Sequence, residues 1–406
     1  MLISFRFKNF RSFLDETFVN MKAVTYKELP DHLVSFENQK LIKTLAVYGP
    51  NSSGKTNIFL AFASFHSFIF WQLFPSQASQ KNKFINLLQL NSMDKIVPFE
   101  QEDIKSPPTE MEISFINGNR MYEYGFTICS QNILTEHLTV DHHLVFSRTE
   151  AGLTYGRSYE KCMRSKSGIH PQRNRLFCSI LSSLDVLEMT AIMKPFEDFF
   201  SSKIHYYFND MDMLQILGNT LMDGKLFKIL ENSEAIHFSL RQLRKLGIPV
   251  EDIIIDKGIP KLGYLIKSRS TGQSFVKYMD ITEISSGTLK NLFMFIRIYE
   301  LIQNGGILMV DSISSEFHPA VTKFIVDSFQ QEINRNIQLI FSTHDISILN
   351  NQQFRRDEVA FVDMNEYGES RLYTLADIKV RSDASFSKDY LLGKYGAIPL
   401  VKDTIF

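Results

Sequence analysis

The fold is decided by the stretch Gly49-Pro50-Asn51-Ser52-Ser53-Gly54-Lys55-Thr56. The short apolar run Leu41 to Tyr48 leads into it and is typical of a buried strand. The residues after Lys55 are apolar over enough turns to predict a buried helix. Strand, glycine-containing loop and helix in this order are what the pattern G-x-x-x-x-G-K-[ST] requires. We therefore predict a phosphate-binding loop (P-loop).

The chemistry of such a loop follows from its residue types. Glycines let the backbone curl so that successive N–H groups face phosphate oxygens, and the helix presents its N-terminal dipole to the same anion. Lys55 is expected to reach the β- and γ-phosphates, and the Thr56 hydroxyl to ligate Mg²⁺. A glycine-serine turn with a chance lysine is the alternative, which the flanking strand and helix disfavour. The predicted nucleotide contacts are Gly49, Asn51, Ser53, Gly54, Lys55, Thr56 and Asn57.

Two apolar strands in the second half of the chain end in polar residues. The strand from Gly306 ends in Asp311, which is expected to hold Mg²⁺ through water. The strand from Gln338 ends at His344, at the same edge of the sheet. A lone histidine there would more often be structural, but beside a P-loop and an acid-ended strand we predict a γ-phosphate sensor.

A weaker signal comes from Ser285-Ser286-Gly287-Thr288, which precedes a predicted helix beginning near Leu289. Small residues leave the N-terminal amides of a helix open to a phosphate. Because many helices begin this way, the segment carries little weight by itself.

Taken in order, these residues resemble the ABC-type ATPases of the SMC/RecF/OLD group, and most closely the small stand-alone ATPases of Rlo-type and Septu-type anti-phage systems. Lys8-Asn9-Phe10-Arg11-Ser12-Phe13 looks like the opening strand of that group, and Phe317-His318-Pro319 looks like the residues after its Walker B strand. Ser342-Thr343-His344-Asp345 resembles its switch, and Tyr390 to Pro399 its closing segment. The likeness covers both ends of the chain and says little about residues 150–260.

The resemblance implies an α/β fold: an ABC-ATPase-like head with a mixed sheet, an antiparallel β subdomain and an inserted α-helical lobe. It also implies that ATP and Mg²⁺ are cofactors and that two copies form a head-to-tail dimer. In such a dimer, ATP on one P-loop is clamped by Ser285, Ser286 and Gly287 of the other copy.

One position departs from that group. After Asp311 the group has a glutamate that positions the attacking water, whereas this chain has Ser312. A hydroxyl is a poor general base at neutral pH, so we expect ATP to bind and hydrolysis to be slow. Glu316 is a candidate replacement, although a residue without a catalytic role is the alternative reading. Both a natural substitution and an engineered trap are consistent with Ser312.

Composition narrows the class. The chain has 406 residues, a net charge of −1 and a hydrophobic fraction of 44%, as expected of a globular protein without general attraction to nucleic acid or membranes. No apolar run reaches the roughly 18 residues that span a bilayer. Three cysteines without metal-binding spacing are typical of reduced thiols, and we expect a cytoplasmic protein.

The pattern of elements divides the chain into three predicted parts. Residues 1–150 form the N-terminal half of the head with the P-loop and antiparallel strands. Residues 151–260 form a basic loop and a helical insertion, which we expect to be a dimer or partner lobe. A stripe such as its Leu184, Leu187, Ile192 and Phe196 is more often core than interface. Residues 261–406 form the C-terminal half of the head.

Three functional readings follow. The preferred one is an ATP-binding sensor and scaffold of an anti-phage defence system. The roughly 60 residues after His344 are too few for the nuclease domain of OLD proteins, so a nuclease or toxin effector would be encoded separately. A RecF-like DNA-repair ATPase is the alternative, and a transporter subunit is disfavoured. DNA contacts would come from Arg157, Lys161, Arg164, Lys166, Arg173 and Arg175, which a solvated loop or partner-docking surface would also explain.

Overall fold

The computed structural model describes residues 1–77, 96–99, 107–130, 132–164, 171–208, 230 and 232–399. The chain divides into two compact units. Unit 1 comprises Met1–Tyr207, Gly306–Ser312 and Val326–Phe406, and unit 2 comprises Phe208–Gly305 and Ile313–Ile325.

Unit 1 contains a six-stranded mixed sheet in the order β11-β15-β16-β5-β17-β18. Neighbouring strands from β15 to β17 are parallel, and β18 pairs antiparallel with β17. Every residue of β5 and β16 is buried, as expected for central parallel strands covered on both faces. The strands are β5 (Thr44–Tyr48), β11 (Ile204–Phe208), β15 (Gly306–Asp311), β16 (Ile337–Ser342), β17 (Val359–Met364) and β18 (Ser370–Thr374).

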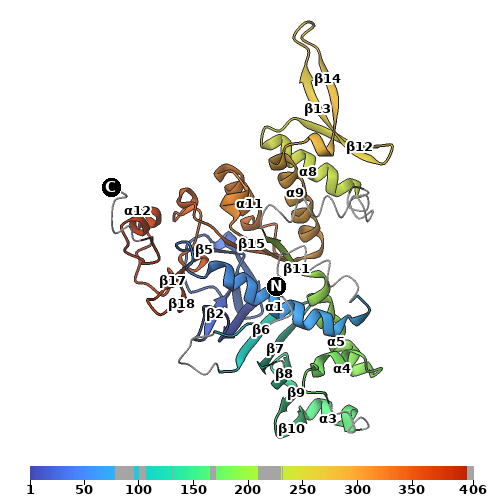
Figure 1. Cartoon of the computed structure of the whole chain (residues 1–406), viewed down its shortest axis with the longest axis vertical. Coiled ribbons are helices and arrows are strands. Elements are labelled where there is room, and N and C mark those ends of the chain that lie inside the picture. Colours follow the sequence, from blue (N-terminus) through green and yellow to red (C-terminus); the bar gives the residue numbers. More distant parts are fainter. Residues whose placement is uncertain are drawn as a thin grey trace. The chain divides into compact units, whose positions relative to one another are not determined.

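The second sheet of unit 1 is antiparallel and seven-stranded, in the order β10-β9-β8-β7-β6-β1-β2 (Figure 1). Its strands alternate buried and more exposed residues, which places one face on the core. The predicted hairpin is confirmed, with Gly118 in the turn at a φ of 63°. The strands are β1 (Leu2–Lys8), β2 (Thr17–Asn20), β6 (Thr109–Asn117), β7 (Arg120–Cys129), β8 (Asn132–Val140), β9 (His143–Thr149) and β10 (Gly152–Tyr155).

Helix α1 (Lys55–Leu73) follows the P-loop and is buried along most of its length. Its Phe62 and Phe65 contact Phe5 of β1, with ring centroids 4.9 and 5.4 Å away. The remaining short elements of unit 1 are η1 (Pro30–His32), β3 (Leu33–Phe36), β4 (Gln39–Ile42), η2 (Pro75–Gln77), α3 (Arg157–Arg164), α4 (Phe177–Ser182), η4 (Ile346–Ile348), η5 (Arg356–Glu358) and α12 (Phe386–Leu391).

Helix α5 (Leu187–Ser202) closes the antiparallel sheet with aromatic side chains. Phe199 stacks on Phe115 of β6 at 3.7 Å between ring centroids, and Phe196 meets Tyr124 of β7 edge to face at 5.1 Å. Of the predicted apolar stripe, Ile192 and Phe196 are core, whereas Leu184 is half-buried and Leu187 is 83% exposed.

A buried amide joins the two sheets of unit 1. The Gln338 side chain on β16 accepts a hydrogen bond from the Leu2 amide at 2.6 Å and donates to the carbonyls of Leu2 and Ile42 at 3.0 and 3.1 Å. Because a buried amide left without partners costs free energy, these three bonds fix the position of β1 against β16.

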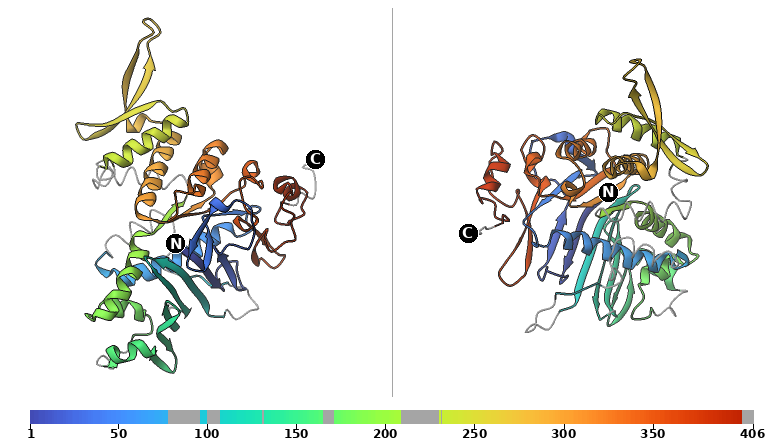
Figure 2. Two further views of the ribbon diagram at one scale, coloured as in Figure 1. Left: turned by 180° about the vertical axis from the view of Figure 1, so that it is seen from behind. Right: turned by 45° about the horizontal axis from the view of Figure 1, so that its top comes forward.

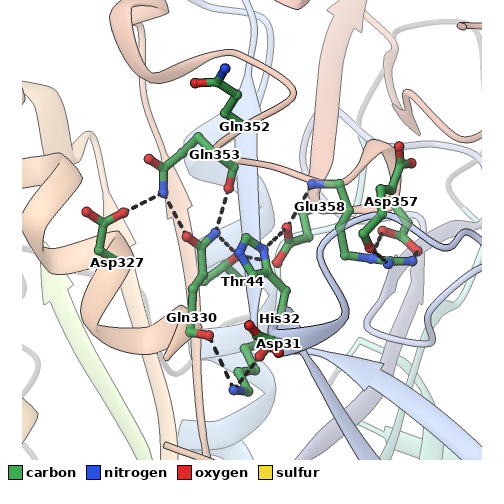
Figure 3. Close-up of polar contacts among 12 residues, drawn as sticks. Asp31, His32, Thr44, Asp327, Gln330, Gln352, Gln353, Asp357 and Glu358 are labelled. Carbon is green, nitrogen blue, oxygen red and sulfur yellow. Dashed lines mark hydrogen bonds and ion pairs between the residues drawn. The ribbon is translucent and has the colours of Figure 1, made fainter. Parts of the chain in front are cut away.

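A buried polar network holds the start of β5 (Figure 3). Glu358 accepts hydrogen bonds from the Thr44 hydroxyl at 2.6 Å and the Arg355 amide at 2.9 Å, and it pairs with the His32 ring at 2.7 Å. Lys43, which is fully buried, donates to the carbonyls of Asp31 and Gln331, both at 2.7 Å. Satisfied buried networks favour one arrangement, so β5 is anchored at the end opposite the P-loop.

Unit 2 combines helices with a three-stranded antiparallel sheet in the order β12-β13-β14. In the two views of Figure 2 the β13–β14 hairpin (yellow) extends beyond the helices of this unit. The elements are α8 (Ser233–Lys245), β12 (Val250–Asp256), β13 (Ile259–Lys267), β14 (Ser274–Asp280), η3 (Ile281–Glu283), α9 (Ser286–Asn304) and α10 (Ile313–Glu316). Helix α11 (Pro319–Gln330) begins among the residues of unit 2 and ends among those of unit 1.

Two strands fall where the sequence predicted helix or left the region unassigned. The run Ile204–Phe208 forms β11 at the edge of the mixed sheet, because a row of aromatic and β-branched residues can extend a sheet that begins elsewhere in the chain. Val250–Asp256 forms β12 for the same reason, with its partner β13 supplied by the next residues.

The division into units also differs from the predicted boundaries at residues 150 and 260. Helices α4 and α5 belong to unit 1, because their aromatic side chains pack on the antiparallel sheet. Helix α9 belongs to unit 2 with α8, where Phe238 and Tyr299 are in ring contact at 5.5 Å. The predicted fold class, α/β with a mixed sheet and an antiparallel β subdomain, is confirmed. Within the described ranges, no helix is both long and apolar enough to cross a membrane.

The Phe115–Phe199 contact predicts a stability effect. Replacing Phe199 by alanine should lower the free energy of unfolding by about 3–5 kcal/mol, because it opens a cavity under the antiparallel sheet. The exposed Leu187→Ala, in the same helix, should leave it within about 0.5 kcal/mol. Urea unfolding of both variants measures the difference, and equal losses would contradict the packing described.

Candidate functional site

The P-loop connects the end of β5 to the start of α1 in unit 1. Gly54 has a φ of 104°, a left-handed backbone that favours glycine. A Cβ atom at this position would collide with the hydroxyl of Ser370 on β18. The glycine is thus required both by its backbone conformation and by the approach of a distant strand.

Lys55 lies inside the loop. Its ammonium donates to the carbonyls of Gly49 and Pro50 at 2.9 and 2.7 Å, and the residue is 6% exposed. Burial lowers the pKa of Lys55 to about 8, partly opposed by the negative charge of Asp311. The ammonium is therefore held by two backbone carbonyls of the loop.

The two predicted metal ligands lie side by side. The Thr56 hydroxyl donates to one carboxylate oxygen of Asp311 at 2.8 Å, although the residues are 255 positions apart in the chain. The Ser342 hydroxyl donates to the other oxygen at 2.5 Å and accepts from the Ser312 amide at 2.7 Å. Ser342 thereby orients Asp311, a role that sequence reasoning did not assign to it.

The chemistry of this pair fits a hard divalent cation. A carboxylate and a hydroxyl are oxygen donors of the kind that Mg²⁺ prefers, and Mg²⁺ commonly takes one or two protein ligands with phosphate oxygens and water completing the shell. Within the described part of the chain, no cluster of three or more His, Cys, Asp or Glu residues forms a metal site. Any cation here would therefore take most of its ligands from phosphate or water.

His344 follows β16 at the same edge of the sheet and is exposed. Desolvation and the positive charge of Lys55 lower the pKa of His344, which favours the neutral ring. A neutral imidazole near Lys55 can donate one hydrogen bond to an anion, as predicted for a sensor.

The two candidates for positioning water differ in environment. Ser312 has a left-handed backbone with a φ of 57°, unusual for a residue with a side chain. Glu316, in unit 2, is buried and its carboxylate lies 2.9 Å from the ammonium of Lys290 in α9. A buried charge paired in this way is costly to release, which favours the non-catalytic reading of Glu316.

Ser285, Ser286 and Gly287 begin α9 in unit 2. The Ser285 side chain accepts from the Thr288 amide at 3.3 Å and so caps the helix. All three residues are exposed. A helix of 19 residues thus presents its capped N-terminus to solvent.

The remaining predicted residues are placed as follows. Asn51 is exposed, Ser53 is buried, and the Asn57 side chain donates to the Ser12 hydroxyl at 2.8 Å. Arg157, Lys161, Arg173 and Arg175 are exposed in unit 1. Lys166 lies outside the described residues, as does the side chain of Arg164.

Comparisons with known proteins place this geometry in context. A family model described as "AAA domain, putative AbiEii toxin, Type IV TA system" matches residues 45–149 and 198–350. These ranges include the P-loop, Asp311 and His344. No curated protein matches the sequence.

Solved structures of SMC heads are similar at low identity. The SMC head domain from Thermotoga maritima is 12% identical with a TM-score of 0.41, covering 92% of this chain and 98% of that one. An Smc head from Pyrococcus furiosus, solved bound to the C-terminal domain of ScpA, is 10% identical with a TM-score of 0.42, covering 97% and 98%.

The environment of Lys55 predicts a pH dependence. Phosphate binding requires the ammonium form, which the free protein loses above a pKa of about 8. Nucleotide affinity should be constant from about pH 7 to 7.5 and should fall by up to about tenfold per pH unit above about 8. Lys55→Arg, which stays charged, should show a flat profile. The same slope in both proteins, measured by fluorescence titration, would assign the pH dependence to another group.

Proposed function

Because the chain belongs to the family described as "AAA domain, putative AbiEii toxin, Type IV TA system", we propose that it is an ABC-type ATP-binding subunit that senses and scaffolds within an anti-phage defence complex. The matched model covers more than half of the chain, including parts of each segment of unit 1. The P-loop ATPase domain follows from this membership, and the defence role, the dimer and the slow hydrolysis are our proposal.

The observation that carries the proposal is the 2.8 Å contact between Thr56 and Asp311. It joins the helix after the P-loop to the acid-ended strand, two segments that a phosphate-bound Mg²⁺ needs at one point. Ser342 holds the second carboxylate oxygen, so Asp311 is preoriented before any ligand binds. Preorientation lowers the cost of binding, since fewer side chains have to be ordered.

Four side chains at the loop would each hold part of the nucleotide or its metal ion. Lys55 would exchange the carbonyls of Gly49 and Pro50 for the β- and γ-phosphates. Thr56 and Asp311 would hold Mg²⁺, which supplies charge neutralisation between the phosphates. His344, whose lowered pKa favours the neutral ring, would donate a hydrogen bond to the γ-phosphate and so distinguish ATP from ADP.

Hydrolysis is proposed to be slow. The position directly after Asp311 is Ser312, which offers no carboxylate. Glu316 is buried and paired with Lys290. Phosphoryl transfer depends on positioning and electrostatics, so binding can persist when the water-positioning group is absent. ATP would then stay bound for a long time as a bridge between subunits, instead of being hydrolysed rapidly.

The bridge would form between two copies of the chain. Ser286 and Gly287 lie exposed at the capped start of α9, where helix amides can meet the γ-phosphate of ATP bound to the second copy. A head-to-tail dimer would therefore contain two composite sites and would respond to ATP as a unit. Higher homo-oligomers could be built from such dimers.

The defence role rests on the family description, which refers to a toxin of a toxin–antitoxin system. We propose that a separately encoded nuclease or toxin is the effector and that the ATP-held dimer restrains it. Expression together with the products of neighbouring genes tests this, with copurification that requires ATP as the expected result. Copurification that is independent of both ATP and Lys55 would contradict control by the nucleotide.

A DNA-binding ATPase is the second candidate, supported by one observation. Arg157, Lys161, Arg173 and Arg175 are exposed within unit 1, near one another in sequence. Such residues can neutralise backbone phosphates, and binding would then weaken steeply with salt. Duplex and gapped DNA titrations at two salt concentrations distinguish this candidate from the first.

A comparison of three variants tests nucleotide use. The parent chain and Ser312→Glu should bind ATP with similar affinity, and Lys55→Ala should lose about tenfold to a hundredfold through loss of a charged contact. Phosphate release should rise well above the parent rate only in Ser312→Glu, because a carboxylate can orient water. Ser312→Gln, the uncharged match, should remain slow.

Two outcomes would contradict the proposal. If Lys55→Ala binds ATP as tightly as the parent chain, the P-loop is not the nucleotide site. If the parent chain and Ser312→Gln both release phosphate at a brisk rate, another group positions the water and hydrolysis belongs in the mechanism.

A further inference from the structure

Three side chains from distant parts of unit 1 form a hydrogen-bonded chain beside the P-loop, here called the serine clip: Ser12, Asn57 and Ser370. Ser370, at the start of β18, lies 2.7 Å from the Ser12 hydroxyl and 2.7 Å from the Ser53 carbonyl. Asn57, in the first turn of α1, donates to Ser12 at 2.8 Å. The Ser370 amide also donates to the Ser12 carbonyl at 2.6 Å.

The direction of the hydrogen bonds follows from the groups involved. A carbonyl can only accept, so the Ser370 hydroxyl donates to Ser53 and shares its single proton with the Ser12 oxygen. The Ser12 hydroxyl accepts from both the Asn57 amide and the Ser370 hydroxyl. Ser12 and Ser370 thus link the Asn57 amide to the Ser53 carbonyl through an unbroken series of hydrogen bonds.

The clip acts on one peptide group of the P-loop. The Ser53 carbonyl and the Gly54 N–H belong to the same planar trans peptide and therefore point in opposite directions. By holding the carbonyl, Ser370 turns the Gly54 N–H away from itself. Ser370 is 6% exposed, so water competes little for this carbonyl.

The space around the two glycines of the loop also shows that the β17–β18 hairpin lies close to the P-loop. A Cβ atom on Gly54 would collide with Ser370 and would lie 2.8 Å from the Ser12 hydroxyl. A Cβ atom on Gly49 would collide with the carbonyl of Val362 on β17. The β17–β18 hairpin therefore supports the loop at both glycines of the motif, from more than 300 residues away in the sequence.

We propose that Ser370 and Ser12 are positioning residues that preset the P-loop for phosphate by fixing the Ser53–Gly54 peptide. The inference rests on the proposed nucleotide binding and adds the β17–β18 hairpin to the machinery of that site. Because the Gly54 amide would serve ATP and ADP alike, the clip should support both nucleotides to the same extent.

The test is a double-mutant cycle on nucleotide affinity in the full chain. Ser370→Ala and Ser12→Ala should each weaken binding of fluorescent ATP and ADP analogues by about threefold to tenfold, the effect of one internal hydrogen bond. The double variant should lose little more than either single one, because the chain is already broken. Ser382→Ala, an exposed serine in the C-terminal region, is the matched control and should bind like the parent.

Thermal unfolding separates positioning from stability. Weaker binding with a melting temperature within about 2 °C of the parent supports the proposal. Affinities within twofold of the parent for both single variants would overturn it, as would additive losses in the double variant. Absence of binding by the parent chain would refute the proposed function itself, an outcome distinct from failure of the clip.

Discussion

The hydrogen bond between Thr56 and Asp311 is the interaction on which the site depends. It exists because β15 and β5 lie in one parallel sheet with only β16 between them, so their carboxyl ends reach the same edge. The buried network around Glu358 and Lys43 fixes the far end of β5, and Gln338 ties β16 to the first strand. Together, these contacts in unit 1 bring the Thr56 hydroxyl to the Asp311 carboxylate.

In the function proposed here, holding a nucleotide and cleaving it depend on different groups. We propose that Lys55 and the loop amides provide charge complementarity to phosphate, whereas cleavage needs a group that orients water. Ser312 has no carboxylate to orient water, and the next acid along the chain, Glu316, forms an ion pair with Lys290. A protein built in this way can use bound ATP as a structural element. Its response would then follow ATP occupancy and dimer lifetime, not turnover.

Sequence reasoning succeeded where structure is set locally. The P-loop, the strand ending at Asp311, the strand before His344 and the Asn117-Gly118 hairpin all depend on neighbouring residues, and the structure contains each of them, although β16 ends at Ser342, before His344. It missed Ser342 and Ser370, because a serine carries no local mark of a partner hundreds of residues away. The strands β11 and β12 were missed for a related reason. A short aromatic or β-branched run forms a strand only where another strand is present to pair with it.

The most direct test of the account is electron–nuclear double resonance of Mn²⁺, used in place of Mg²⁺, with ATP bound to the full chain. We predict an immobilised Mn²⁺ with phosphorus couplings from ATP, lost in Asp311→Asn and weakened in Thr56→Val, because both residues would hold the cation. Ser382→Ala should leave the spectrum unchanged. Phosphorus-coupled Mn²⁺ of equal occupancy in all four proteins, or no immobilised Mn²⁺ in the parent, would contradict the assignment of this edge of the sheet as the nucleotide site.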